Sequence, residues 1–83
     1  MNHSLKCNPP FFEDVRTNDK PFELRKNDRP FSVGDMLFLQ EYCPVTKDYS
    51  GRECRRRISY ILSDYPGLCR GYVILGLVEV TDY

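Results

Sequence analysis

The segment from residue 20 to residue 29 carries the first side chains whose types and spacing could do chemistry. Two cations flank one carboxylate there, and two more cations follow: Lys20, Glu23, Arg25, Lys26 and Arg29. Glu23 and Arg25 are two positions apart, so on a strand they project from one face, which Lys20 can also reach. Such a trio can hold phosphate or carbonyl oxygens while its carboxylate accepts a hydrogen bond. The alternative is a solvated ion-pair surface, which spacing alone favours, because exposed pairs contribute only about 0–1 kcal/mol each.

A second cationic cluster lies at residues 52–57, where the sequence reads RECRRR. Strand alternation places Arg55 and Arg57 on one face and Arg56 on the other. Guanidinium groups match the geometry of phosphate oxygens, and nearby tyrosines could stack on bases: Tyr42, Tyr49 and Tyr60. A nucleic-acid contact and a charge-protected edge strand explain this cluster equally well.

Several catalytic and cofactor patterns are absent from the sequence. It contains no glycine-rich phosphate loop and no serine nucleophile elbow. The four cysteines form no C-x-x-C pair and His3 is the single histidine, so neither a metal site nor a cofactor is expected. We expect reduced, mostly buried thiols and an ordinary surface or core histidine.

Length and composition indicate one small domain over residues 1–83. The chain is 41% hydrophobic and 29% charged, and 12 basic side chains balance 12 acidic ones. Zero net charge gives no general attraction to nucleic acids or membranes, so any such partner must recognise a local patch. No apolar run reaches the roughly 20 residues of a membrane span, and none follows the start as a signal peptide would. We therefore expect a cytoplasmic protein without a membrane partner, and a monomer by default.

Hydrophobic periodicity predicts about five strands and one early helix. The strands are expected at residues 3–7, 21–26, 36–42, 53–63 and 72–80. The helix should begin at Pro9–Pro10, because proline is favoured in the first turn. It should bury Phe11, Phe12 and Val15 as one stripe and end at Asn18.

Alternation also predicts how the strands face the core. In the second strand two apolar residues should point inward and two charged residues outward: Phe22 and Leu24, then Glu23 and Arg25. In the fourth strand one face should be shared by Cys54, Arg56, Ile58, Tyr60 and Leu62.

So many strands on so short a chain must close into a barrel or cover their edges. Residues 49–51 should form a turn, and Gly76 suggests a bulge, a bend or a close backbone approach. The expected fold is mainly β with one or two helices (α+β): a small closed or half-closed barrel whose end is plugged by the helix.

Residues 18–25, which read NDKPFELR, resemble a known signature. They are similar to the G-x-K-x-x-E-x-R pattern of ASCH domains, small β-barrels of the PUA-like superfamily. ELRKNDR with a following VGD makes the resemblance more specific. Nearly the whole chain resembles a compact ASCH-like family of uncharacterised, mostly bacterial and phage proteins. Asn18 stands where the signature has glycine, and asparagine also tolerates the left-handed conformation of a helix cap.

The resemblance implies a PUA-like barrel in which the signature residues line a cleft between helix and barrel. It also implies RNA binding as the role of that cleft. Some relatives instead hydrolyse an acyl amide on a modified cytidine with the signature lysine, which matches Lys20. Glu23 stands where those relatives have a threonine, and no counterpart of their additional glutamate can be placed in this shorter chain.

Three functional hypotheses follow. The favoured one is a binding module for RNA or a nucleotide-like ligand, in which Lys20 and Arg25 contact phosphate or base oxygens and Glu23 accepts from an amine or a hydroxyl. Arg55 and Arg57 would extend that contact along the backbone. The second is a small amidohydrolase acting on acylated cytidines with Lys20 as base. The third is a protein-interaction adaptor, in which the cleft charges only stabilise the fold.

Overall fold

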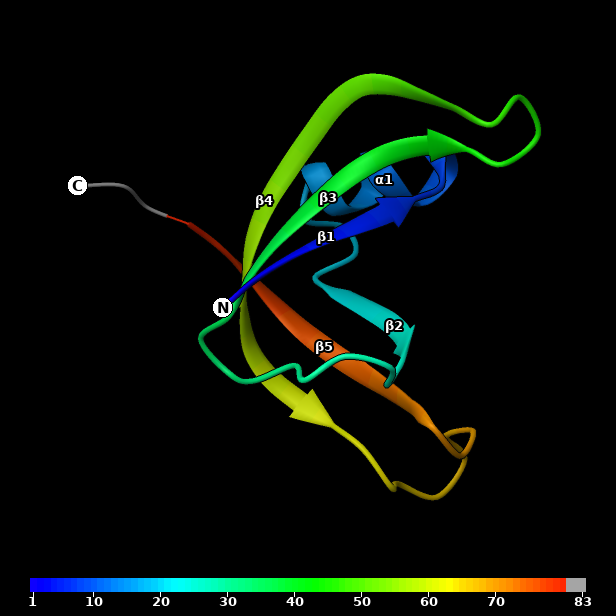
Figure 1. The fold of residues 1–83 in the computed structure, drawn as a ribbon. Coiled ribbons are helices and arrows are strands. Elements are labelled where there is room, and N and C mark those ends of the chain that lie inside the picture. Colours follow the sequence, from blue (N-terminus) through cyan, green and yellow to red (C-terminus); the bar gives the residue numbers. More distant parts are fainter. Residues whose placement is uncertain (81–83) are drawn as a thin grey trace.

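Five strands and one helix make up the part of the chain that the computed structural model describes, residues 1–80 (Figure 1). In chain order they are β1 (Asn2–Cys7), α1 (Pro9–Arg16), β2 (Phe22–Lys26), β3 (Met36–Cys43), β4 (Asp48–Leu62) and β5 (Tyr72–Glu79). The predicted mainly β fold with an early helix is confirmed. Residues 81–83, the last of the predicted domain, lie outside the described residues.

The strands form one curled sheet in the order β1-β3-β4-β5-β2. β1 runs parallel to β3, and each of the other neighbouring pairs is antiparallel. The 15-residue β4 bends, so that its first part pairs with β3 and its second part with β5 (Figure 1). The result is a half-barrel in which β1 and β2 are the two edge strands.

Alternate residues of the strands line the inner face of the half-barrel, where α1 packs. The most buried strand residues, each at most 2% exposed, are Leu5, Leu37, Leu39, Ile58, Val73 and Leu75. Phe12 and Val15 of α1 are each 1% exposed, but Phe11 is 50% exposed, so its predicted burial is wrong. Phe11 precedes Phe12 by about 100° around the helix, which turns its ring away from the sheet.

The orientation of β2 is the reverse of the predicted one. Phe22 and Leu24 are 43% and 53% exposed, whereas Glu23 is 4% exposed. Directly paired residues of neighbouring strands share a face, and Glu23 pairs with the buried Leu75 of β5. The alternation is present, but its charged face is the inner one, because Glu23 meets two cations there.

The turn between β3 and β4 is tighter than predicted. It occupies residues 44–47, and Lys47 takes a left-handed conformation with φ of 59°. Residues 49–51, predicted as the turn, belong to the start of β4. Gly51, with φ of 92°, lies where the β3–β4 register shifts, so this glycine marks a bulge within the ladder.

A second register shift, between Ile58 and Tyr60, changes the face that β4 presents. Arg56 and Ile58 share a buried face, in line with their predicted common face, but Tyr60 is 63% exposed, so its predicted place on that face is wrong. Gly76 of β5 pairs with Tyr60, and a Cβ on this glycine would lie 3.2 Å from Ser59 Oγ. The predicted close approach at Gly76 is confirmed.

Candidate ligand-binding cleft

Lys20, Glu23 and Arg25 come together on the inner side of the sheet. The Lys20 ammonium lies 3.1 Å from Glu23 Oε1, and the Arg25 guanidinium lies 3.5 Å from Glu23 Oε2. The Glu23 side chain is 5% exposed, and the two cations are 21% and 28% exposed. Each carboxylate oxygen thus has its own cation, which offsets the cost of burying the charge.

The end of α1 brings Lys20 to this position. Asn18 takes the left-handed conformation with φ of 68°, so the predicted helix end there is confirmed. The Lys20 N–H donates to the Asp14 carbonyl at 2.9 Å. The chain then enters β2, whose pairing with β5 directs Glu23 and Arg25 inward.

A cleft of about 380 Å³ opens beside the three charged side chains. The other residues that line it come from β1, α1, β2 and the β1–α1 junction: Lys6, Cys7, Asn8, Phe11, Phe22 and Leu24. The Phe11 and Phe22 rings have their centroids 4.9 and 5.5 Å from Lys20 Nζ. The cleft therefore combines an enclosed ion pair with two partly exposed aromatic rings.

The thiols beside the cleft do not suit nucleophilic chemistry. Cys7 is 3% exposed, and burial, together with the Glu23 carboxylate, raises the pKa of its thiol from 9.0 to about 11. The thiol is therefore neutral at pH 7, and a neutral thiol is a poor nucleophile. Cys54 is also buried, while Cys43 is half-buried and Cys69 is exposed, so the expectation of buried thiols holds for two of the four.

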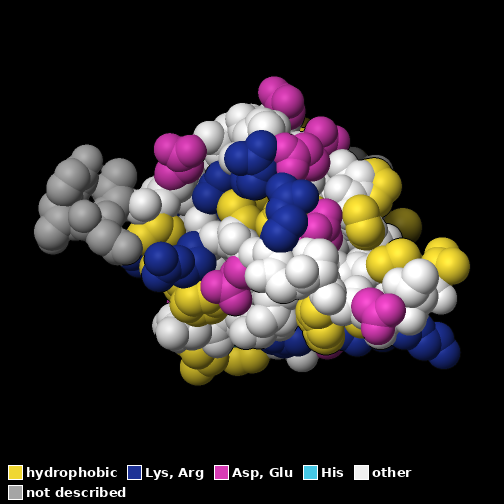
Figure 2. All heavy atoms as spheres, turned by 90° about the horizontal axis from the view of Figure 1, so that it is seen from above, with side chains coloured by type: hydrophobic (Ala, Val, Ile, Leu, Met, Phe, Trp, Pro, Cys, Tyr) yellow, Lys and Arg dark blue, Asp and Glu magenta, His cyan; other side chains and the backbone are white. Residues whose placement is uncertain are grey.

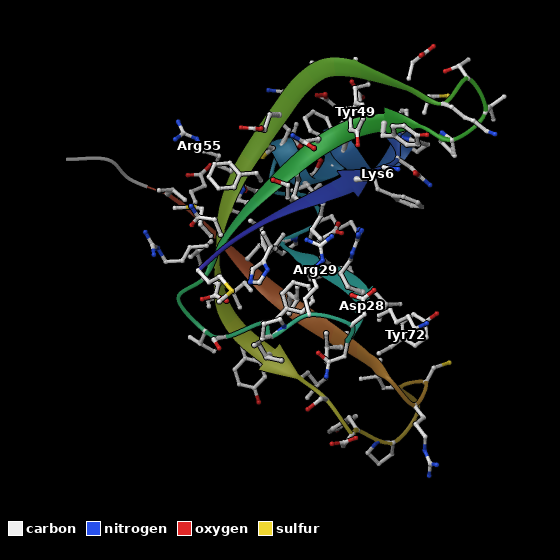
Figure 3. All side chains as sticks on the ribbon, in the orientation of Figure 1. Lys6, Asp28, Arg29, Tyr49, Arg55 and Tyr72 are labelled. Carbon is white, nitrogen blue, oxygen red and sulfur yellow. The ribbon has the colours of Figure 1, made fainter. Side chains whose placement is uncertain are left out.

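Arg25 and Arg29 bridge the two edges of the half-barrel. Arg25 Nη1 donates to the Lys6 carbonyl and Arg29 Nη1 donates to the Ser4 carbonyl, each at 3.0 Å. Ser4 and Lys6 are alternate residues of β1, so both carbonyls point to the same edge of that strand. Figure 3 shows Arg29 between β1 and β2. Two arginine side chains thus connect edges that no strand pairing joins.

Lys26 and Arg29 lie next to the cleft and do not line it. With Asp28 they contribute to a separate hollow of about 210 Å³. Of the five charged residues singled out between positions 20 and 29, the structure therefore brings three into the cleft, and Arg29 has a structural hydrogen bond.

Arg55 and Arg57 belong to a different surface. They pair with Phe38 and Met36 of β3 and are exposed on the outer face of β4. Figure 3 shows Arg55 on the side of the molecule away from Arg29. The structure therefore separates the two groups of predicted ligand residues into an inner cleft and an outer face.

Arg56 has a structural role that sequence reasoning missed. It is 9% exposed, and its Nη2 group lies 3.2 and 3.1 Å from the Val15 and Arg16 carbonyls and 3.3 Å from Asn18 Oδ1. These acceptors lie at the end of α1, where carbonyls lack helical partners. The sequence offered one signal of this role. Alternation places Arg56 on a strand face that it shares with apolar residues, and an arginine on a buried face needs hydrogen-bond acceptors.

His3 and Asp35 form a second buried pair that the sequence did not reveal. His3 Nε2 lies 2.8 Å from Asp35 Oδ2, which also accepts from the Ser32 N–H at 3.0 Å. The hydrogen bond from His3, then those from the terminal amino group and Ser32, hold the pKa of Asp35 at about 2, below its usual 3.8. This cluster ties the start of β1 to the segment that precedes β3.

Opposite charges are interleaved on one face of the molecule (Figure 2). Figure 2 shows basic and acidic side chains side by side on one face. At Glu13, hydrogen bonds from Arg16 and then Arg52 lower the pKa of the carboxyl from 4.5 to about 2. Within residues 1–80, no cluster of three or more His, Cys, Asp or Glu side chains is arranged to hold a metal ion. The same residues include no helix of sufficient length and apolarity to span a membrane.

The fold and the cleft define a class of protein: a small half-barrel β domain with one helix and a charged cleft on its inner side. Within this class, the chain belongs to the family described as Domain of unknown function (DUF3850), which matches residues 2–77. The matched range contains the cleft residues and the outer arginines alike.

The chain is also similar to an uncharacterised 12.9 kDa protein in the GpA 3′ region of Escherichia phage P2. The two are 33% identical over 73 residues, which cover 88% of this chain and 64% of the phage protein. The chain therefore spans less than two thirds of that relative. The predicted similarity to phage proteins is confirmed.

Proposed function

We propose that the cleft binds a nucleotide-like ligand, either free or as part of an RNA. The observation that carries this proposal is the enclosed Glu23 carboxylate, held between Lys20 and Arg25 on the wall of a cleft of about 380 Å³. A buried carboxylate with a cation on each side provides acceptors and donors in fixed positions. A polar ligand that carries hydrogen-bond donors and acceptors along one edge matches that arrangement.

Each cation has donors beyond the one directed at Glu23. A guanidinium carries five N–H donors and an ammonium three, and both side chains are partly exposed toward the cleft. Lys20 and Arg25 would contact phosphate or base oxygens. Glu23 would accept from an exocyclic amine or a ribose hydroxyl. Lys26 and Arg29, in the adjoining hollow, would meet a ligand that extends past the cleft.

The aromatic rings favour a ligand with a flat ring. Phe11 and Phe22 are 50% and 43% exposed, which is unusual for phenylalanine, and both line the cleft. A nucleobase can stack on such rings while its polar edge faces the charged trio. The resemblance to ASCH domains, for which RNA binding is the role usually proposed, supports the same ligand class.

A titration of the ¹⁵N-labelled protein with 5′-mononucleotides in 20 mM salt tests the proposal. We expect chemical-shift changes that cluster at residues 20–25 and at Phe11. Lys20→Gln should weaken binding about tenfold or more, since it removes a charge-assisted contact. Lys47→Gln, which removes an exposed lysine from the β3–β4 turn, is the matched control and should bind as wild type does.

Absence of shift changes with all four mononucleotides at millimolar concentration would overturn this proposal. If Lys20→Ala and Glu23→Ala then lower stability and no ligand is found, the cleft charges only stabilise the fold, as the adaptor hypothesis requires.

A second candidate is amide hydrolysis, for which the cleft places Lys20 Nζ and Glu23 Oε1 3.1 Å apart. In this reaction water would attack the amide carbonyl of an acylated cytidine, and the products would be the free amine and a carboxylate. Lys20 would have to be in its neutral form to accept the proton of the water; it would then pass that proton to the departing cytidine amine, and Glu23 would orient the water. Mass spectrometry of acylated cytidine incubated with the protein should show loss of the acyl group, and Lys20→Gln should abolish it. Unchanged substrate after incubation with wild type would remove the candidate.

A further inference from the structure

The outer face of β1, β3 and the first part of β4 carries three cations that contact no carboxylate within residues 1–80: Lys6, Arg55 and Arg57. Lys6 pairs with Gln40 of β3, and Arg55 pairs with Phe38. Directly paired residues project from the same face, and Gln40 and Phe38 are alternate residues of β3. The three cations therefore belong to one continuous surface.

Aromatic side chains lie among these cations. Phe38 is the direct partner of Arg55. Tyr42 and Tyr49 pair across β3 and β4 with ring centroids 4.9 Å apart, and Lys6 Nζ lies 4.4 Å from the centroid of Tyr42. Tyr49 is 54% exposed. Figure 3 shows Tyr49 and Arg55 along β4 and Lys6 at the end of β1. Positive charge and stacking surface thus occur together.

A hollow of about 390 Å³ opens next to Tyr49, at the bulge in β4. Its lining residues are Gln40, Tyr49, Gly51, Arg52 and Glu53. The Gln40 amide can donate and accept, and the Glu53 carboxylate can accept. Gly51 contributes no side chain, and open space lies where its Cβ would be. A flat ring against Tyr49 would therefore find polar partners for its edge.

The remaining outer face has a different character. Over the second part of β4, β5 and β2 its exposed side chains are mainly apolar: Phe22, Leu24, Tyr60, Tyr72 and Val78. The three cations without a carboxylate contact therefore lie toward the other half of the sheet, together with Tyr42 and Tyr49.

We propose that this outer cationic face binds a single-stranded nucleic acid, at a site that shares only Lys6 with the cleft and is independent of the function proposed for the cleft. Arg55, Arg57 and Lys6 contact phosphates, while bases stack on Tyr49 and Phe38, and one base enters the hollow. Arg55 and Arg57 are alternate residues of a strand, so their Cα atoms are about 6.6–6.8 Å apart, which allows contacts to successive phosphates. A single strand fits better than a duplex because its bases are available for stacking. An acidic peptide would use the cations but leave the rings unused.

Fluorescence anisotropy with a fluorescein-labelled 12-nucleotide oligouridine, between 20 and 200 mM KCl, tests this proposal. The logarithm of the affinity should fall linearly with the logarithm of the salt concentration. Arg55→Gln should reduce that slope by about 0.7, the value for one phosphate contact on a single strand. Tyr49→Leu should weaken binding about tenfold at fixed salt, because a stacked base is lost.

Two control variants separate this site from charge in general and from the cleft. Arg70→Gln removes an exposed arginine from the β4–β5 loop and should leave the slope unchanged. Lys20→Gln alters the cleft, and the loss of slope caused by Arg55→Gln should be the same in the Lys20→Gln background as in wild type, so the two proposals can fail separately. Circular dichroism should show that all four variants are folded, since Arg55, Tyr49, Arg70 and Lys20 lie outside the hydrophobic core.

Lack of binding at 20 mM KCl would overturn the proposal, and so would an equal loss of slope in Arg70→Gln and Arg55→Gln. It would also be overturned if Tyr49→Leu bound as wild type does and polyglutamate displaced the oligouridine as well as unlabelled oligouridine. That pair of results would mark a surface that attracts any polyanion.

Discussion

Arg55 and Arg56 are neighbours on β4 and lie in opposite environments. Arg56 points to the inner side of the sheet, where its guanidinium meets the last carbonyls of α1. Arg55 points to the outer side and contacts no carboxylate within residues 1–80. The same contrast separates Glu23, enclosed between two cations, from the exposed Glu53. The inner charges are therefore enclosed by partners within the fold, while the outer ones are exposed.

This contrast also sets the salt response that each region should show. Interactions among enclosed charges are screened weakly, and those of exposed charges are screened over about 10 Å at 0.1 M salt. Ligand binding at the outer face should therefore depend on salt more steeply than binding in the cleft. Substitutions on the inner side should lower stability more than substitutions on the outer face do.

The largest effect should come from Glu23→Gln, with Glu53→Gln as its control on the outer side. The first change leaves Lys20 and Arg25 without their shared counterion, and we expect the free energy of unfolding to fall by about 3 kcal/mol. Glu53→Gln should change it by less than about 0.5 kcal/mol. Urea denaturation followed by circular dichroism measures both. Equal effects of the two variants would contradict the distinction between inner and outer charges.

A smaller effect is expected from Arg56→Met, compared with Arg55→Met. Arg56→Met removes the hydrogen bonds that a buried, charged donor makes to the end of α1, which should cost about 2 kcal/mol. Arg55→Met should cost less than about 0.5 kcal/mol. The same urea experiment applies, and hydrogen exchange of the α1 amides should increase in Arg56→Met alone. Unchanged protection of α1 would show that Arg56 does not hold the helix end.

The smallest effect on stability is expected from the protonation of Asp35 at acid pH. Because the pKa of Asp35 is about 2 in the folded protein and 3.8 ordinarily, the carboxylate contributes stability above about pH 4 that is lost as the pH falls toward 2. Urea midpoints at pH 2.5, 4 and 6 should decline less steeply for Asp35→Asn than for wild type. The pKa of Glu13 is also about 2, so Glu13 titrates in the same window, and the comparison should be repeated in a Glu13→Gln background, where its contribution is absent. A wild-type slope in Asp35→Asn would contradict the assignment.

Much of the architecture could be predicted because it depends on local pattern. Alternation located the strands, the proline pair located the start of α1, and Asn18 located its end. The charged residues of the cleft could also be predicted from the sequence, since Lys20, Glu23 and Arg25 are close in sequence and strand geometry places two of them on one face. Their contacts in the structure follow that expectation.

The missed features depend on partners that are distant in sequence. Arg56 reaches acceptors about 40 residues away, and His3 reaches Asp35 across 32 positions. Local pattern can place Arg56 on a strand face, but it does not identify the distant partner of either residue. The bulge opposite Gly76 had a local signal in the glycine, but its effect on Tyr60 required the register of two strands.

The sequence by itself determined the number and approximate limits of the strands, the helix and the identity of the charged trio. Only the tertiary structure decided which face of each strand is inside. Period-two alternation is symmetric, so it distinguishes two faces without saying which one meets the core. In β2 the partner strand β5 made the charged face the inner one, since two cations compensate the buried Glu23. As a result, residues 20–25, whose composition is typical of a solvated segment, line a cleft. Arg55 and Arg57 lie on a separate surface.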